Sequence, residues 1–324
     1  MNFGMRATAM RVPHVSTGPR AMSNKKIVST PAAAQTIRPP VQWRSVAAFS
    51  ALAYALSWGW WAPMVWPHLS GITLAGPLPN LVEGGSVRVP LGMFGPLIAA
   101  MIMRLFVTRD GLKGTLGTVR PWRYYVVGIA APAFFVASII CVDHVTGLGH
   151  FAPSRPLGLA IPTVVIVGGA LSLPLTIGEE YGWRGYLLPR LLPLGEVRAT
   201  LIVAVIWALW HVPILLIGLN YPNQSLMTVL PVFGAAVILT AFPFTWLYVQ
   251  SRSSVMVVAV MHGVLNATGD TFTSSKYLQG NPLVVSAGGL VAGGILLTVI
   301  VAYGAHRYAG SGTRSIPQCE RTMQ

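Results

Sequence analysis

Long apolar runs separated by short polar segments dominate the chain from about residue 46 onward. A helix needs about 20 mostly apolar residues to span a bilayer, and backbone groups in lipid must be satisfied within a helix or a closed barrel. Strand-like alternation is absent, so the pattern predicts an all-α, polytopic membrane helix bundle. Eight runs qualify as transmembrane helices: Val46–Trp66, Val89–Phe106, Tyr124–Val142, Leu157–Ile177, Thr200–Leu219, Met227–Val249, Val255–Asp270 and Leu283–Tyr303. The fourth is expected to continue as helix towards Leu188.

Basic residues between the runs predict the orientation, because Lys and Arg are enriched in cytoplasmic loops. With eight crossings and a cytoplasmic N-terminus, all but three of the 22 Lys and Arg fall in cytoplasmic segments; the exceptions are Arg88, Arg155 and Lys276. A missed or extra crossing would destroy this asymmetry. Both termini are therefore expected in the cytoplasm.

Composition agrees with this class of protein. Hydrophobic residues make up 53% of the chain and charged residues 9%, with a mean hydropathy of +0.62, whereas soluble domains carry roughly 25% charged residues. The net charge of +14 lies mostly between the apolar runs and lacks aromatic interleaving, so the expected partner is the lipid bilayer and not nucleic acid. The Ala-, Gly-, Val- and Arg-rich composition favours a bacterial cytoplasmic (inner) membrane.

Three segments are expected along the chain. Residues 1–44 are basic, free of acids and rich in Ser, Thr and Pro, which predicts a disordered tail; residues 45–306 form the transmembrane domain and residues 307–324 a cytoplasmic tail. A mitochondrial presequence has a similar composition to the first segment. The favoured alternative is a translation start at Met22 in place of Met1, followed by an uncleaved membrane anchor.

Two adjacent acids stand inside the fourth run, Glu179 and Glu180. Ionisable residues at membrane depth are costly and usually functional. Glu180 and Arg184 are four residues apart with the acid first, the favoured order for a helical ion pair. This pairing leaves Glu179 as the unpaired carboxylate and the candidate general base.

Further polar residues lie in the fifth and seventh runs. His211 lies in the fifth, and His262, Asn266 and Asp270 share one face of the seventh. At a helical rise of 1.5 Å per residue, Glu179, His211, His262 and Asn266 lie at depths in the membrane that allow them to meet in the cytoplasmic half of the bundle. Asp270 is expected to be a solvated helix end or the partner of a lysine in the next loop.

These polar groups also fit a structural role or a metal site. A lone intramembrane histidine often makes only an interhelical hydrogen bond. Two His and one Glu also suit a zinc ion with one open position, although no His-Glu-x-x-His is present and the two cysteines, Cys141 and Cys319, have no zinc-site spacing.

At these residues the chain resembles the CPBP family of intramembrane proteases, which includes the type II CAAX prenyl endopeptidases and bacterial bacteriocin-processing and self-immunity proteins. Three family motifs can be placed in order: Glu-Glu-x-x-x-Arg on Glu179, Glu180 and Arg184, Phe-x-x-x-His on Trp207 and His211, and His-x-x-x-Asn on His262 and Asn266. Trp replaces Phe in the second motif, which keeps an aromatic ring. The resemblance covers roughly residues 90–270.

The resemblance implies a metal-independent, CAAX-type glutamic endopeptidase that works inside the bilayer without a cofactor. The roles that it implies are water activation by Glu179 and His211, oxyanion stabilisation by His262 and Asn266, and support from the ion pair of Glu180 with Arg184. The substrate would be a prenylated protein, a peptide precursor or leader, or a lipid-linked peptide. The competing functions are a non-catalytic bacteriocin-immunity or scaffold protein, a zinc-dependent form of the protease, and a proton- or metal-coupled carrier.

Overall fold

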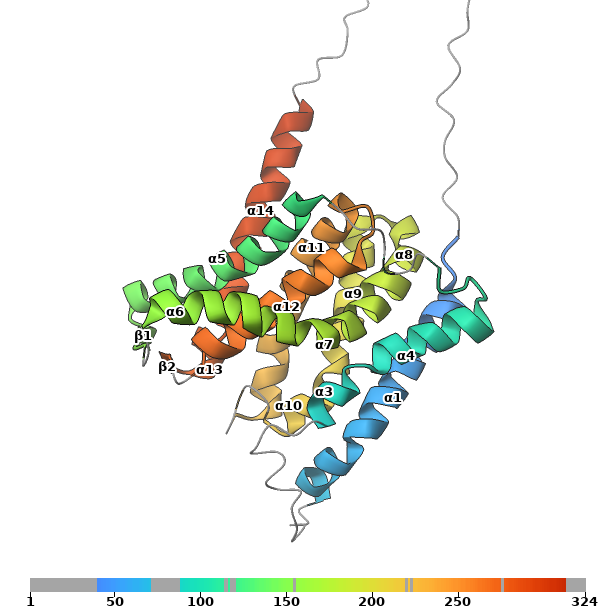
Figure 1. The fold of residues 1–324 in the computed structure, drawn as a ribbon, viewed down its shortest axis with the longest axis horizontal. Coiled ribbons are helices and arrows are strands. Elements are labelled where there is room, and N and C mark those ends of the chain that lie inside the picture. The colour runs from blue at the N-terminus through green and yellow to red at the C-terminus, as the bar shows by residue number, and fades with distance from the viewer. Residues whose placement is uncertain are drawn as a thin grey trace, which may run out of the picture. The chain divides into compact units, whose positions relative to one another are not determined.

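A computed structural model describes the chain at residues 40–70, 88–113, 116, 121–153, 156–218, 221, 224–274 and 277–312. Within these residues the fold is a bundle of helices with one short two-stranded ribbon (Figure 1). The predicted all-α class is therefore confirmed. Residues 1–39, with Met22, and residues 313–324 lie outside the described residues, so the expected N-terminal tail and most of the C-terminal tail stay predictions.

The elements follow one another along the chain as α1 (Trp43–Ser70), α3 (Arg88–Gly92), α4 (Gly95–Ile102), η1 (Met103–Val107), α5 (Trp122–Thr146), β1 (Gly149–Phe151), α6 (Leu157–Pro162), η2 (Thr163–Gly168), α7 (Gly169–Gly182), η3 (Trp183–Leu187), α8 (Leu188–Leu191), η4 (Leu192–Leu194), α9 (Glu196–Trp210), α10 (Val212–Leu216), α11 (Leu226–Gln250), α12 (Val255–Phe272), β2 (Leu278–Gly280), α13 (Pro282–Val285) and α14 (Leu290–Gly312). The elements η1, η2 and η3 are π-helical and η4 is a 3₁₀-helix. Strands β1 and β2 pair antiparallel, with Gly149 opposite Gly280.

Six helical segments in the described part of the chain are long and apolar enough to cross a membrane: Arg88–Val107, Trp122–Thr146, Leu157–Leu194, Leu226–Gln250, Val255–Phe272 and Pro282–Gly304. The chain is accordingly an integral membrane protein. Helices α1 and α9 are not among the six, and the 15 residues of α9 extend only about 22 Å at 1.5 Å per residue. The count of eight crossings and the cytoplasmic placement of the termini stay predictions.

The fifth predicted helix, Thr200–Leu219, differs in the structure. Helix α9 already begins at Glu196 and ends at Trp210, and the short α10 follows after His211. Pro213 is the second residue of α10, and a proline lacks the backbone N–H that would continue the ladder of α9. His211 therefore stands at a break between two helices and not in the middle of one. The eighth predicted helix is likewise divided, into α13 and α14.

The fourth predicted helix continues further than expected. Helical structure runs from Leu157 to Leu194, with the π-helical segments η2 and η3 on either side of α7. A π-helical turn accommodates an extra residue within an α-helix and is frequent at functional sites. Segment η3 begins three residues after Glu180, so the side chains that follow the acidic pair are rotated away from their ideal α-helical positions.

Helix α12 lies inside the bundle, packed against α7 and α5, while α7 also contacts α4 (Figure 1). Glycines allow these helices to pack closely against one another. A Cβ atom on Gly263 of α12 would lie 3.0 Å from the carbonyl oxygen of Gly169, and one on Gly182 of α7 would lie 2.5 Å from Cβ of Pro96. The first contact brings α7 against the histidine-bearing helix α12, and the second brings α7 against α4.

Candidate active site

The acidic pair lies in the last turn of α7, where Glu179 is 1% exposed and Glu180 is fully buried. Arg184, which is also fully buried, donates from Nη1 to Glu180 Oε1 at 2.8 Å. The pairing expected from their spacing is thus present in the structure. Buried charges are tolerated when they are paired and hydrogen-bonded, and this pair remains within one stretch of helix.

The Arg184 guanidinium also lies over two aromatic rings. Its central carbon is 4.5 Å from the ring centroid of Trp207 and 4.8 Å from that of Phe244. A cation over an aromatic face is attracted by the ring quadrupole, more strongly when both are out of water. Arg184 therefore connects η3 to both α9 and α11, through charge as well as packing.

Glu180 has a second partner, which the sequence did not indicate. His262 Nδ1 lies 2.9 Å from the same Oε1 atom that accepts from Arg184. A carboxylate is a hydrogen-bond acceptor, so His262 Nδ1 carries a proton in this arrangement. The Nε2 atom of His262 is then the nitrogen left for other chemistry. Glu180 is a structural link between α7 and α12, and not a free carboxylate.

Within the described residues, one carboxylate oxygen of Glu179 accepts a hydrogen bond and the other does not. Trp207 donates from its indole Nε1 to Glu179 Oε2 at 2.9 Å, while the buried Oε1 has no hydrogen-bond partner among the described residues. From the sequence, Trp207 was expected only to keep an aromatic ring at a position where the family motif has Phe. The structure shows that its N–H binds the candidate base, and Phe could not do this.

His211 is oriented by the backbone of its own helix. Its Nδ1 atom lies 2.7 Å from the carbonyl oxygen of Trp207, one turn earlier. A carbonyl only accepts, so Nδ1 carries the proton and, in the neutral ring, Nε2 is the acceptor nitrogen. The rings of Trp210 and Phe233 pack on His211 at centroid distances of 4.9 and 5.0 Å.

A cavity of about 380 Å³ brings the candidate residues together. Glu179, His211, His262 and Asn266 all border it, and so does Asp270, which was expected to be a solvated helix end. The remaining lining is largely apolar and consists of Val89, Pro90, Met93, Ser172, Leu175, Trp207, Ile214, Leu215, Phe233, Ala236, Val237, Thr240, Leu265, Gly269, Ala287 and Gly288. The four side chains that the sequence motifs selected thus border one cavity.

A zinc ion would need three protein ligands around one point. Within the described residues, no three His, Cys, Asp or Glu side chains come together as a metal site. The Glu180 oxygen nearest His262 is already shared with Arg184, and His211 binds a backbone carbonyl through Nδ1.

Comparison with known proteins agrees with the geometry. Residues 159–268 match a family model described as "Type II CAAX prenyl endopeptidase Rce1-like". This segment is therefore similar to the Rce1-like endopeptidases. The matched segment runs from α6 into α12 and includes both acids, Arg184, both histidines and Asn266. The family is one of proteases, which supports a membrane protease role, and the resemblance to the type II CAAX endopeptidases is confirmed. No curated protein matches the chain.

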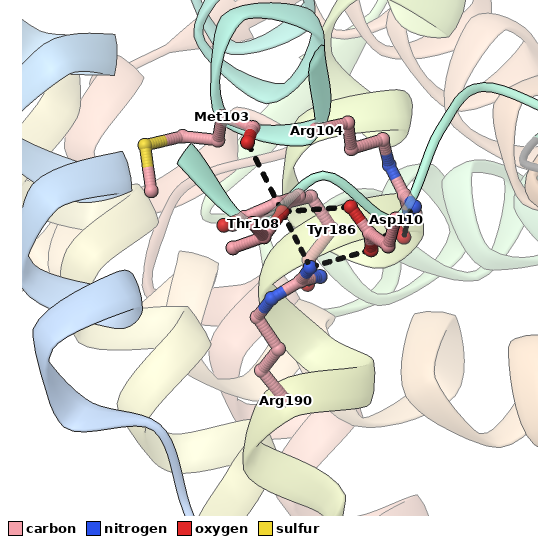
Figure 2. Close-up of polar contacts among 7 residues, drawn as sticks. Met103, Arg104, Thr108, Asp110, Tyr186 and Arg190 are labelled. Carbon is pink, nitrogen blue, oxygen red and sulfur yellow. Dashed lines mark hydrogen bonds and ion pairs between the residues drawn. The ribbon is translucent and has the colours of Figure 1, made fainter. Parts of the chain in front are cut away.

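A second polar cluster, absent from the motifs, holds the end of the Rce1-like domain's acidic helix. Arg104 of η1 donates to Asp110 at 2.9 Å and to the carbonyl oxygen of Gly185, inside η3, at 2.7 Å. Arg190 of α8 donates to the same Asp110 oxygen at 2.7 Å, and its guanidinium lies 3.5 Å from the ring centroid of Tyr186 (Figure 2). No sequence motif indicated this cluster, because its members come from loops and helices far apart in the chain.

The electrostatics of Asp110 follow from these contacts. Partial burial raises the pKa of its carboxyl, but the hydrogen bonds from Thr108 and Arg190, together with the charges of Arg104 and Arg190, lower the pKa below its ordinary value. Thr108 donates to Asp110 Oδ1 at 2.7 Å (Figure 2). The carboxylate therefore stays ionised and keeps both arginines in place beside η3.

Proposed function

We propose that the chain is an intramembrane glutamic endopeptidase that works without a metal and hydrolyses peptide bonds of a membrane-associated peptide or protein. The observation that carries the proposal is the buried carboxylate of Glu179, whose Oε1 has no partner in the described residues and which borders a cavity shared with His211, His262 and Asn266. Peptide hydrolysis needs a base for water, donors for the oxyanion and a proton for the leaving amine. These four side chains offer all three.

Water activation falls to Glu179 and His211. Trp207 holds Glu179 Oε2, so Oε1 is the atom that takes a proton from a water molecule in the cavity. His211 offers Nε2 as a second acceptor for the same water, because its Nδ1–H is bound to a backbone carbonyl. The water oxygen then bonds to the peptide carbonyl carbon, and the proton held on Glu179 passes to the leaving amine as the C–N bond breaks.

Oxyanion stabilisation falls to His262 and Asn266. The Asn266 amide donates through its NH₂ group. His262 donates from Nε2 when both ring nitrogens carry protons, and Glu180 supplies the negative partner for such a ring through the 2.9 Å contact with Nδ1. Charge placed in advance at the developing oxyanion is commonly the largest single contribution to catalysis. The Glu180–Arg184 pair thus supports the site without touching the substrate.

The substrate class follows from the cavity and from the family. The family name points to prenylated substrates, and the largely apolar lining suits an apolar peptide, a peptide precursor or leader, or a lipid-linked segment that enters from the bilayer. In this proposal the enzyme works in a bacterial inner membrane with its N-terminus in the cytoplasm.

The proposal is tested by the isosteric change Glu179→Gln. Cells that produce the wild type or the variant are compared by mass spectrometry of released peptides and new N-termini. Loss of a general base is expected to reduce cleavage by roughly 100- to 10,000-fold. The matched control is Glu196→Gln, which removes an exposed carboxylate from the first turn of α9 and should leave the cleavage pattern intact. Unchanged cleavage by Glu179→Gln, at equal membrane levels, would refute the proposal and favour a non-catalytic immunity or scaffold protein.

A further inference from the structure

Asp270 is the one acidic group of the cavity that the proposed chemistry does not use. It lies on α12, eight residues beyond His262 and just past the segment that matches the protease family. Its side chain is exposed and borders the cavity, and no hydrogen bond or ion pair involves it within the described part of the chain. The lysine considered as its partner, Lys276, lies outside the described residues.

The charges around the cavity are unbalanced. Its lining contains two carboxylates and two imidazoles but no Lys or Arg. An ionisable residue at membrane depth is costly and generally has an identifiable partner. Glu179 already accepts a hydrogen bond from Trp207, whereas no described residue donates a hydrogen bond to Asp270. Asp270 is therefore open to a cationic group carried by a molecule that fills the cavity.

The spacing along α12 places this carboxylate relative to the chemistry. Eight residues at 1.5 Å each separate Asp270 from His262 by about 12 Å along the helix axis. An extended peptide advances about 3.3 Å per residue, so the separation corresponds to three or four substrate residues. A group bound at Asp270 would lie that far along α12 from a peptide bond held at His262.

We propose that Asp270 is a specificity-determining residue, which binds a cationic group of the substrate three or four residues from the scissile bond. This inference rests on the proposed function, because it takes the cavity as the substrate site. The cation is an ammonium or guanidinium group, from a Lys or Arg side chain or from a free N-terminus. A substrate whose C-terminal carboxylate falls at this distance, as in a CAAX sequence cut after its Cys, is repelled if it extends towards Asp270.

The inference is tested by binding, which does not require turnover. Full-length Glu179→Gln protein in lipid nanodiscs is incubated with a pool of apolar, N-acetylated peptides that differ at one position, occupied by Lys, norleucine or Glu. Retained peptides are quantified by mass spectrometry. A hydrogen-bonded charge pair should favour the Lys peptides over the norleucine peptides by roughly tenfold. The preference should disappear in Glu179→Gln/Asp270→Asn and turn towards Glu in Glu179→Gln/Asp270→Lys.

Two further arms sharpen the result. Peptides with a free N-terminus and no Lys distinguish a terminal ammonium from a side-chain cation, and Glu179→Gln/Glu196→Gln controls for the loss of a carboxylate outside the cavity. Equal retention of Lys and norleucine peptides, at any level, overturns the inference, as does a preference that survives Asp270→Asn. If the wild type cleaves the same pool without a charge preference, the proposed function stands and the inference about Asp270 fails. If Lys peptides are preferred in binding but cleavage does not depend on Glu179, the proposed function fails and only the binding inference stands.

Discussion

Trp207 offers the sharpest test of the site, because the family motif and the structure predict opposite results for Trp207→Phe. The change restores the residue of the Phe-x-x-x-His motif, so the motif alone predicts a neutral effect. In the structure, the change removes the 2.9 Å hydrogen bond to Glu179 Oε2. Since Oε1 already has no partner among the described residues, both oxygens of a buried carboxylate would then be unsatisfied.

The size of the effect follows from the contact. A hydrogen bond to a charged group contributes about 1.5–3 kcal/mol, and leaving a buried group unpaired costs a similar amount. Trp207 is 4% exposed, so the smaller Phe ring also leaves a void, which adds about 1 kcal/mol. We expect a loss of stability of about 2–4 kcal/mol and, because the candidate base loses its orientation, a fall in cleavage of roughly 10- to 100-fold.

The matched control is Trp183→Phe. Trp183 is fully buried, and its indole nitrogen has no hydrogen-bond partner among the described residues, so this change removes the same ring volume without breaking a hydrogen bond that the structure shows. Both variants are compared with the wild type in detergent by thermal unfolding and by the rate of peptide release. If Trp207→Phe cleaves as fast as the wild type and is no less stable than Trp183→Phe, then the indole does not position Glu179.

Three more predictions concern the framework of the site. Gly182→Ala should lower the apparent unfolding temperature, because the new Cβ would lie 2.5 Å from a proline of α4. Gly234→Ala should leave this temperature unchanged, because a Cβ there would have no atom within 4 Å, and equal unfolding temperatures for the two variants would contradict the packing argument. Glu180→Gln should destabilise by about 3–5 kcal/mol, because it leaves a buried arginine without its anion, and Glu196→Gln at the surface should show no such loss in the same unfolding assay. Asp110 has a lowered pKa, so its stabilisation is present above its unfolded pKa of about 3.9 and is lost as the pH falls through the folded value. Acidification should therefore destabilise the wild type more than Asp110→Asn, by at most about 1 kcal/mol because the carboxylate is 39% exposed, and identical pH profiles would refute this assignment.

The local parts of the site were predictable from sequence. The ion pair of Glu180 with Arg184 follows from helical spacing, and depth along the helices was enough to place Glu179, His211 and His262 together. Each of these inferences uses only the rise and rotation along the individual helices. The apolar runs identified the helices for the same reason, although proline and π-helical turns changed where they begin and end.

The contacts between helices could not be predicted in this way. The bond from Trp207 to Glu179 and the sharing of Glu180 with His262 depend on how α7, α9 and α12 are rotated against one another. That rotation is set by close contacts such as Gly263 against Gly169, which leave no periodic signal in the sequence. The cluster around Asp110 is missing from the prediction for the same reason.

The order of synthesis gives the shared Glu180 oxygen a role in biogenesis. Arg184 follows Glu180 by four residues, but Trp207 follows Glu179 by 28 and His262 follows Glu180 by 82. An uncompensated charge at the bilayer centre costs about 2.5–3.5 kcal/mol on insertion scales, so the emerging acidic helix depends first on its own arginine. A nascent chain that stops before α12 already has the ion pair of Glu180 with Arg184 and the bond from Trp207 to Glu179, but it lacks the histidine that shares the Glu180 oxygen. The contact that joins α7 to α12 is therefore the last of the three to become possible during synthesis.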